Sequence, residues 1–327
     1  MTWIKRSFAL RDPAVKLSIV ATLYRSAQGL QEFHQRCMAA AAATTDEVEM
    51  ILVDDGSPDD SLDVALALQA DDPRVIVVEL ARNFGHHKAM MTGLQHATGD
   101  LVFLLDSDLE EPPEALSRFH AKLEGEGWDV VFGVQRARRG GFFERITGKI
   151  FYRIIESLSD RSIPQNLLTA RLMRRDYVDA LIAHQDRSFQ MSDLWVLTGF
   201  RQAPMEMEKL ALSPTTYSFA RRIRMAVDHV TTTSTRLLYL IFYCGLALSG
   251  TAMAVTLVLF LRFLTHGVAM DGWTSLFLSV WFFGGVIVLV LGILGIYMAA
   301  LLEEAKRRPY THLRRLHRPS AIEKASP

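Results

Sequence analysis

The sequence predicts an α/β protein with a mostly parallel sheet, followed by a transmembrane hairpin of two helices. Over residues 1–135, short apolar runs alternate with helical patterns, as expected of a parallel sheet covered by helices on both faces. Two later runs, 237–261 and 275–302, contain no charged residue. Each exceeds the roughly 20 residues that a helix needs to cross a bilayer. The chain of 327 residues is long enough for about two domains, here the sheet domain and a membrane anchor.

The predicted strands are short apolar runs separated by segments long enough for crossover helices. They lie at 17–23, 50–53, 75–80, 101–105 and 130–133. In such a sheet the ligand binds beyond the carboxyl ends of the strands. The residues directly after each strand are therefore the first candidates for a functional site.

The overall composition excludes several classes of protein. The 36 basic and 36 acidic residues cancel, so net charge does not favour a nucleic-acid partner. The two cysteines, Cys37 and Cys244, are assigned to the sheet domain and the first apolar run. Neither a disulfide framework nor a cysteine zinc site is then available, which is typical of a reducing, cytosol-facing location.

The charges that flank the apolar runs predict their orientation. Arginines 221, 222, 224 and 236 precede the first run, and Lys306 and arginines 307, 308, 314, 315 and 318 follow the second. The connection at 262–274 carries only Arg262, so both termini are predicted to be cytoplasmic and the protein an integral membrane protein. The predicted parts are a sheet domain at 1–218, a juxtamembrane amphipathic helix at 219–236, a hairpin at 237–302 and a basic cytoplasmic tail at 303–327. For 219–236 an ordinary solvated helix is the alternative.

Acidic residues follow two of the predicted strands. Asp54 and Asp55 end the second strand, and Asp106 and Asp108 follow the fourth. No G-x-G-x-x-G or G-x-x-x-x-G-K-[ST] loop occurs, so a bound diphosphate would need other neutralisation. Two carboxylates one residue apart can supply it through a divalent cation, Mg or Mn. The alternative is that these acids only precede a helix that begins near Pro112.

Three segments together resemble the family-2 inverting glycosyltransferases of GT-A fold. They are VDDGSPDDS, ARNFGHHKAMMTGLQHATGD and LLDSDLEEPPE. With RRGGFFERITGKIFYRII and the hairpin, the resemblance is closest to the branch of dolichyl-phosphate mannose synthase and bacterial polyprenyl-phosphate glycosyltransferases. It covers about residues 15–302. It implies a Rossmann-like catalytic domain that moves a sugar from a nucleotide-diphosphate donor, commonly a UDP-sugar, to a polyprenyl phosphate at the cytoplasmic membrane face, as in the synthesis of cell-envelope polysaccharide.

The resemblance also implies roles for individual residues. For the nucleotide sugar these are Thr22, Tyr24, Asp54, Asp55, Asn83, Lys88 and Asp106. Asp106 and Asp108 are implied as metal ligands and catalytic residues. For the donor or acceptor phosphate they are Arg136, Arg138, Arg139, Thr169 and Arg171. His86 and His87 are adjacent and do not share a helix face, so they are not expected to be ligands.

The sequence departs from the family pattern at two places. The usual V-P-V-Y-N-E is here the ATLYRS of residues 21–26, and the Asp of the G-D-F-R-L string aligns with Thr169. A threonine hydroxyl is too weakly basic to act as a general base. A phosphate acceptor needs no base, because its second pKa lies near 6 and it is already anionic at pH 7. A hydroxyl acceptor would need one, and Asp193 is then the nearby carboxylate to nominate as a catalytic residue.

Two other functions remain open at this point. One is a membrane glycosyltransferase that acts on a saccharide or lipid hydroxyl. The other is an inactive glycosyltransferase-like scaffold. The expected partners are a nucleotide-sugar donor, a polyprenyl-phosphate acceptor and the membrane, with no nucleic acid; a homo-oligomer is compatible with the sequence. The sequence does not specify the sugar or the nucleobase.

Overall fold

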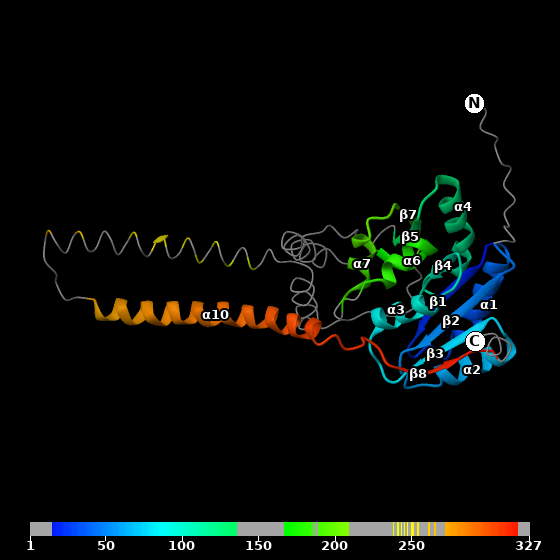
Figure 1. Ribbon diagram of the computed structural model, residues 1–327, viewed down its shortest axis with the longest axis horizontal. Helices are drawn as coiled ribbons and strands as arrows, with labels where there is room; N and C mark the ends of the chain where they lie inside the picture. The colour runs from blue at the N-terminus through cyan, green and yellow to red at the C-terminus, as the bar shows by residue number, and fades with distance from the viewer. Residues whose placement is uncertain are drawn as a thin grey trace, which may run out of the picture. The chain divides into compact units, whose positions relative to one another are not determined.

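The computed structural model describes residues 15–135, 167–184, 186, 189–208 and 272–319, together with single positions between 238 and 265 (Figure 1). These residues fall into two compact units. The first contains Met1–Arg139, Ile163–Thr216 and Pro309–Pro327, and the second Gly140–Ser162 and Tyr217–Arg308. Each unit is described by itself.

The first unit is built on one eight-stranded sheet with the order β7-β5-β6-β4-β1-β2-β3-β8. The strands are β1 (Leu17–Leu23), β2 (Val48–Asp54), β3 (Val75–Leu80), β4 (Leu101–Leu104), β5 (Val130–Gln135), β6 (Leu167–Arg174), β7 (Gln202–Met207) and β8 (Leu313–His317). The four central strands β4, β1, β2 and β3 are parallel. The predicted parallel sheet is thus confirmed, and all five predicted strands are present to within two residues at either end.

Helices cover both faces of this sheet. On one face, α1 (Leu30–Ala42), α2 (Ser61–Asp71), the short 3-10 helix η1 (Pro113–Ala115) and α4 (Leu116–Glu126) pack in one hydrophobic cluster. On the other face, α3 (His86–His96), α6 (Arg175–Ile182) and α7 (Met191–Leu197) pack in a second. Every residue of β1 is consequently buried, including its two polar residues Ser18 and Thr22, which explains why the strand lacks the regular alternation of apolar and polar residues found in half-exposed sheets.

The last strand of the sheet comes from the end of the chain, which the sequence predicts as a separate basic tail. β8 pairs antiparallel with β3, and the Ala81 amide donates to the His312 carbonyl at 2.9 Å. The Glu79 carboxylate accepts from Arg314 at 3.3 Å and contacts His317 at 3.2 Å. The basic residues of the predicted cytoplasmic tail are in part the partners of a carboxylate on β3.

The described part of the second unit is dominated by α10 (Trp273–Ala305), which contains the predicted second span. Its stretch Phe283–Leu302 is long and apolar enough, by length and composition, to cross a membrane. Side chains along it, such as Val288 and Met298, are about two-thirds exposed. The predicted juxtamembrane helix at 219–236 lies outside the described residues, and so does the predicted first span at 237–261 apart from single positions.

Candidate active site

The polar residues predicted from the sequence gather at the carboxyl edge of the central strands. Thr22 lies near the end of β1, beside Val53 in the register with β2. Asp54 is the last residue of β2, and Asp106 follows β4, which pairs with the other side of β1. Because parallel strands end at the same edge, the sheet itself brings these side chains together.

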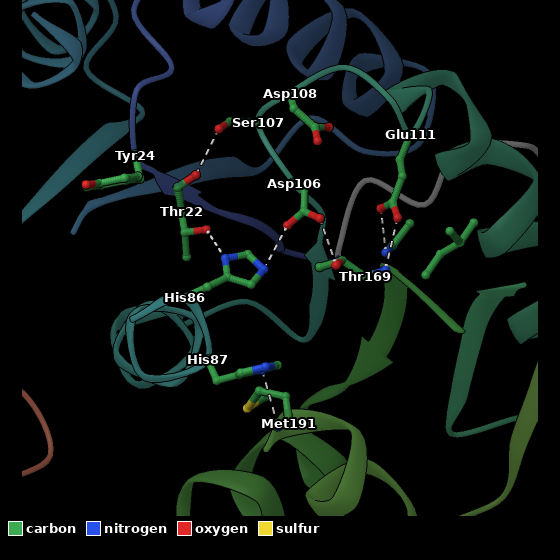
Figure 2. A network of polar contacts seen from close by, with 12 residues as sticks. Thr22, Tyr24, His86, His87, Asp106, Ser107, Asp108, Glu111, Thr169 and Met191 are labelled. Carbon is green, nitrogen blue, oxygen red and sulfur yellow. Dashed lines mark hydrogen bonds and ion pairs between the residues drawn. The ribbon is translucent and has the colours of Figure 1, made fainter. Parts of the chain in front are cut away.

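Asp106 is held from two sides (Figure 2). Its Oδ1 lies 3.2 Å from Nε2 of His86, and its Oδ2 accepts the Thr169 hydroxyl at 2.8 Å. Nδ1 of His86 in turn lies 2.9 Å from the hydroxyl of Thr22. Residues from β1, α3, the end of β4 and β6 therefore meet in one chain of polar contacts, with the Asp106 carboxylate near its centre.

His86 is a site residue that the sequence analysis missed. It is the first residue of α3, directly after Gly85, whose φ of 100° turns the chain from the loop into the helix. Partial burial alone would lower the pKa of His86, but the hydrogen bond and charge of Asp106 outweigh it and raise the pKa above its usual value. Two adjacent residues of a helix point in different directions, so His86 and His87 do not act as a pair. His86 alone can still reach the site, because it begins α3 directly after the loop at the end of β3.

The three side chains of the D-x-D triplet, residues 106–108, differ in burial. Ser107 is 5% exposed, donates to the Thr22 carbonyl at 2.8 Å and lies 3.0 Å from the Ser26 hydroxyl. With Ser107 directed into the protein, Asp106 is half-buried and Asp108 is exposed. Leu109 then adopts a left-handed backbone, with φ of 58°, and the Glu110 amide caps Asp108 at 3.0 Å. The triplet thus contributes one half-buried and one exposed carboxylate to the site.

The acidic pair after β2 supports the loop after β3. Both oxygens of Asp55 accept backbone amides, from Phe84 at 2.7 Å and from Gly85 at 2.9 Å. Gly56 has a φ of 61°, and a Cβ there would lie 2.6 Å from backbone atoms of Arg82 and Asn83. Burial raises the pKa of Asp55, and the two amides partly offset this. The Asp55 carboxylate therefore positions the loop after β3, and its contact with a nucleotide stays a prediction.

The remaining predicted residues differ in accessibility. Asp54 is 3% exposed and accepts the Ser57 amide at 3.3 Å. Tyr24 is 48% exposed at the end of β1, Asn83 is exposed, and Lys88 and Asp193 are half-buried in the first turns of α3 and α7. Arg136, Arg138 and Arg139 lie outside the described residues.

Arg171 does not have the position that a phosphate ligand needs. It is 1% exposed, its guanidinium lies 3.0 Å from the ring centroid of Trp195, and it donates to the carbonyls of Thr169 and Leu168. Burial lowers its pKa to about 10, although Tyr177 and Glu111 nearby act in the opposite direction. The structure thus places Arg171 in the core, where its contacts with Trp195 and the β6 carbonyls do not favour the predicted phosphate contact.

The carboxylates at this edge of the sheet are the type of ligand that a hard divalent cation prefers. Among the described residues, no group of three or more His, Cys, Asp or Glu side chains could hold a metal ion. Mg²⁺, however, is usually held by one or two carboxylates together with substrate phosphates and water. Asp106 and Asp108 supply such a pair, and the exposure of Asp108 leaves it accessible to a ligand.

Comparison with known protein families gives a match over the same region. Residues 18–182, which include β1 to β6 and the whole of the Asp106 network, match glycosyl transferase family 2. A Mycobacterium tuberculosis (strain CDC 1551 / Oshkosh) protein whose name assigns it to the glycosyltransferases is 45% identical over 320 residues, covering 96% of this chain and 94% of its own length. The uncharacterized glycosyltransferase YkcC of Bacillus subtilis (strain 168) is 32% identical over 300 residues, or 90% and 92% of the two chains.

Two solved structures are more distant. The mannosyltransferase PcManGT of Pyrobaculum calidifontis, in complex with GDP-Man and Mn²⁺, is 15% identical, covers 90% of this chain and 89% of its own, and gives a TM-score of 0.43. The glucosyl-3-phosphoglycerate synthase of Mycobacterium tuberculosis, with Mn²⁺ and UDP-glucose, is 18% identical, covers 67% and 78%, and gives 0.45. The family match and the two sequence relatives identify this chain as a member of glycosyl transferase family 2, and the protein is a glycosyltransferase.

Proposed function

We propose that this glycosyltransferase moves a sugar from a nucleotide-diphosphate donor, most simply a UDP-sugar, to a polyprenyl phosphate at the cytoplasmic face of a membrane. The sugar's anomeric carbon forms a bond to an acceptor phosphate oxygen while its bond to the donor diphosphate breaks, and the nucleoside diphosphate leaves. In-line displacement inverts the configuration at that carbon.

The observation that carries this proposal is the state of Thr169. The family pattern has an aspartate there, and this chain has a hydroxyl that donates to Asp106 at 2.8 Å. A hydroxyl committed as a donor to a carboxylate does not take a proton from an acceptor. A phosphate monoester requires no such step, since it is already anionic at pH 7. The substitution therefore favours a phosphate acceptor over a saccharide hydroxyl.

Asp106 and Asp108 are the residues that would hold a divalent cation. A bound cation would neutralise the charge that develops on the departing diphosphate. In this arrangement His86 and Thr169 orient Asp106, while the exposed Asp108 is oriented by the Glu110 amide. The chain's own contribution is thus to fix two carboxylate oxygens before the donor arrives.

The membrane part of the proposal rests on α10 and β8 together. The apolar side chains of α10 need an apolar environment, which a bilayer provides. β8 belongs to the same sheet as β1 to β7, so the chain must leave and return on the same side of any membrane that it crosses. If α10 crosses once, a second crossing is required between residues 208 and 272, and the uncharged run 237–261 lies in that interval. This supports a hairpin with the sheet domain and both termini on one side.

The proposal is tested by following the sugar in a defined system. Purified full-length protein in detergent is incubated with Mg²⁺ or Mn²⁺ and with UDP-glucose, UDP-N-acetylglucosamine or GDP-mannose, each labelled in the sugar. The acceptor is a C55 polyprenyl phosphate, and the matched control is the corresponding polyprenol, which presents a hydroxyl on the same chain. We expect a labelled lipid that contains a sugar–phosphate linkage only with the polyprenyl phosphate.

Two results would contradict the proposal. Transfer to the polyprenol or to an added saccharide at a comparable rate would favour a hydroxyl acceptor, for which Asp193 is the carboxylate to test by Asp193→Asn. Absence of transfer from all three donors, with the nucleotides still bound, would favour a domain that binds donors without turning them over.

A further inference from the structure

The backbone of β6 is irregular beside the Asp106 network. Its ladder with β4 ends at the pair Leu104 and Arg171. Its ladder with β5 passes from the pair Phe132 and Arg171 to the pair Val134 and Leu167, with a shift in register. Residues 168–170 thus form a bulge, which breaks the ladder and changes the direction of the side chains that it carries.

The Glu111 carboxylate fills this break. Its Oε1 accepts the amide of Thr169 at 3.0 Å, and its Oε2 accepts the amide of Ala170 at 2.7 Å. Glu111 is 1% exposed, so these are hydrogen bonds to a buried charge, which are stronger than those between neutral groups. Figure 2 shows the carboxylate facing both amides, with Thr169 between it and Asp106.

From this geometry we propose that Glu111 is a positioning residue for the glycosyl-transfer site. By fixing the backbone at the β6 bulge it sets the position of the Thr169 hydroxyl, and through that hydroxyl it orients the Asp106 carboxylate. Glu111 does not touch the donor in this scheme. The inference depends on Asp106 serving glycosyl transfer and is independent of the chemical class of the acceptor.

The charge of Glu111 also has a partner in the core. Arg171 is buried to the same extent, and the negative charge of Glu111 favours its protonated form. Removing one member of such a pair leaves the other uncompensated, which is costly for folding. A variant at Glu111 can therefore lose stability for a reason unrelated to the site, and the test must separate the two effects.

A double-mutant cycle makes this separation. Glu111→Gln and Thr169→Val are made singly and together, and kcat and KM are measured with the labelled nucleotide sugar that gives the fastest turnover in the unmutated protein. If Glu111 acts through Thr169, Glu111→Gln lowers kcat/KM about tenfold when Thr169 is present. In the Thr169→Val background, which lacks the hydroxyl, adding Glu111→Gln should lower kcat/KM by less than about twofold. Thr169→Ser, which restores the donor, should recover most of the activity.

Glu49→Gln is the matched control. Glu49 is also a buried carboxylate that accepts a backbone amide, from Thr98 at 2.6 Å, but it lies at the opposite end of β2 from Asp54. Glu49→Gln should lower thermal stability without changing turnover per folded molecule.

Hydrogen exchange of the Thr169 and Ala170 amides gives a readout besides activity. It should become faster in Glu111→Gln and not in Glu49→Gln.

Several outcomes would overturn the proposal. One is an equal loss of kcat/KM from Glu111→Gln with and without the Thr169 hydroxyl. Another is unchanged turnover per folded molecule, which would make Glu111 a purely structural residue like Glu49. If Glu111→Gln alone does not fold, Glu111→Gln with Arg171→Met removes both buried charges and is placed in the same cycle against Arg171→Met.

Discussion

The Thr169 hydroxyl donates a hydrogen bond to the Asp106 carboxylate at 2.8 Å, across two antiparallel strands of the sheet. Thr169, which stands where the family pattern has an aspartate, therefore makes a specific contact in the site. It supplies a donor to the D-x-D carboxylate, where an aspartate would place a second negative charge. Asp106 is thus paired with a neutral hydroxyl and not with a second carboxylate.

Restoring the family aspartate should harm this enzyme. In Thr169→Asp a carboxylate replaces the donor beside Asp106, and two like charges at hydrogen-bond distance disfavour full ionisation of both. We expect turnover in detergent to fall at least about tenfold, because the hydrogen bond that orients the Asp106 carboxylate is lost. Thr169→Asn, a neutral side chain that can still donate, is the control and should retain more activity than Thr169→Asp. Faster turnover in Thr169→Asp would indicate a hydroxyl acceptor that needs a base.

Donor binding should require the exposed carboxylate of the D-x-D triplet. Asp108→Asn should abolish metal-dependent binding and leave the fold intact, because removing one charge from an acidic cluster relieves repulsion. In a thermal-shift assay with a bound nucleotide sugar and Mn²⁺, a ligand at 100 times its Kd stabilises the unmutated protein by about 2.7 kcal/mol. The shift should disappear with Asp108→Asn and with EDTA. Asp63→Asn, at an exposed position on α2, should keep it; an EDTA-resistant shift in the unmutated protein would exclude the metal role.

Arg171 should matter for stability and not for phosphate binding. Its guanidinium is buried against Trp195 and near Glu111, so Arg171→Ala leaves both a cavity and an uncompensated carboxylate. We expect the free energy of unfolding to fall by about 3 to 5 kcal/mol, measured by urea unfolding in detergent. Arg171→Met fills more of the space and should lose less. If either variant unfolds like the unmutated protein but has a raised KM for the donor or acceptor, the guanidinium does reach the substrate.

His87 should make stability depend on pH. Burial, assisted by the nearby charge of His86, lowers the pKa of His87 to about 4, and its Nδ1 accepts the Met191 amide at 3.4 Å. An unfolded chain takes up this proton near pH 6.5, so between about pH 6.5 and 4 the unfolded state binds more protons. The free energy of unfolding should therefore fall as the pH drops through this window, by up to about 1.4 kcal/mol per unit from this group.

His87→Gln isolates that contribution. The glutamine amide oxygen can still accept from the Met191 amide, and it does not titrate. Urea unfolding at pH 7.5, 6 and 5 should show a shallower loss of stability in His87→Gln than in the unmutated protein. Identical pH slopes for the two proteins would mean that His87 is protonated as easily in the folded state as in the unfolded one.

The topology is open to direct labelling in cells. If the proposed hairpin is correct, a tag inserted near Asp271 should be accessible from outside, and tags at either terminus should not. Protease added to intact cells should spare the sheet domain. External cleavage at Arg315 would be incompatible with the hairpin, because Arg315 pairs with Glu79 in the β3–β8 ladder.

The central strands and their strand-end residues could be predicted because their signals are local. β1 to β4 are short and mostly apolar, and a parallel sheet places the residues after them at one edge. The positions of Asp54 and Asp106 follow from that rule, whereas Thr22 was taken from the family resemblance. The predicted fold class was therefore correct where the hydrophobic pattern is strong.

The contacts of the site could not be predicted in the same way, because they join residues far apart in the chain. Examples are the contact of His86 with Asp106 and that of Glu111 with the bulge at Thr169. These contacts depend on how the strands pair and on an irregularity in the β5–β6 ladder, and neither produces a periodic pattern in the sequence. The burial of Arg171 was not predicted, because its phosphate contact was taken from the family resemblance. Which face of β6 it occupies is decided by the pairing with β4, which the sequence does not display.

β8 has a consequence for how the protein is made. The edge of β3 is covered by β8, a strand that is synthesised after the apolar segment of α10. A nascent chain must hold β3 unpaired on that side until β8 has been synthesised, with its backbone donors and acceptors open to other strands. A fragment cut after β7 to obtain a soluble enzyme would keep that open edge permanently and would lose the partners of Glu79. We expect such fragments to aggregate, and supplying the 309–319 segment as a separate peptide to suppress that aggregation.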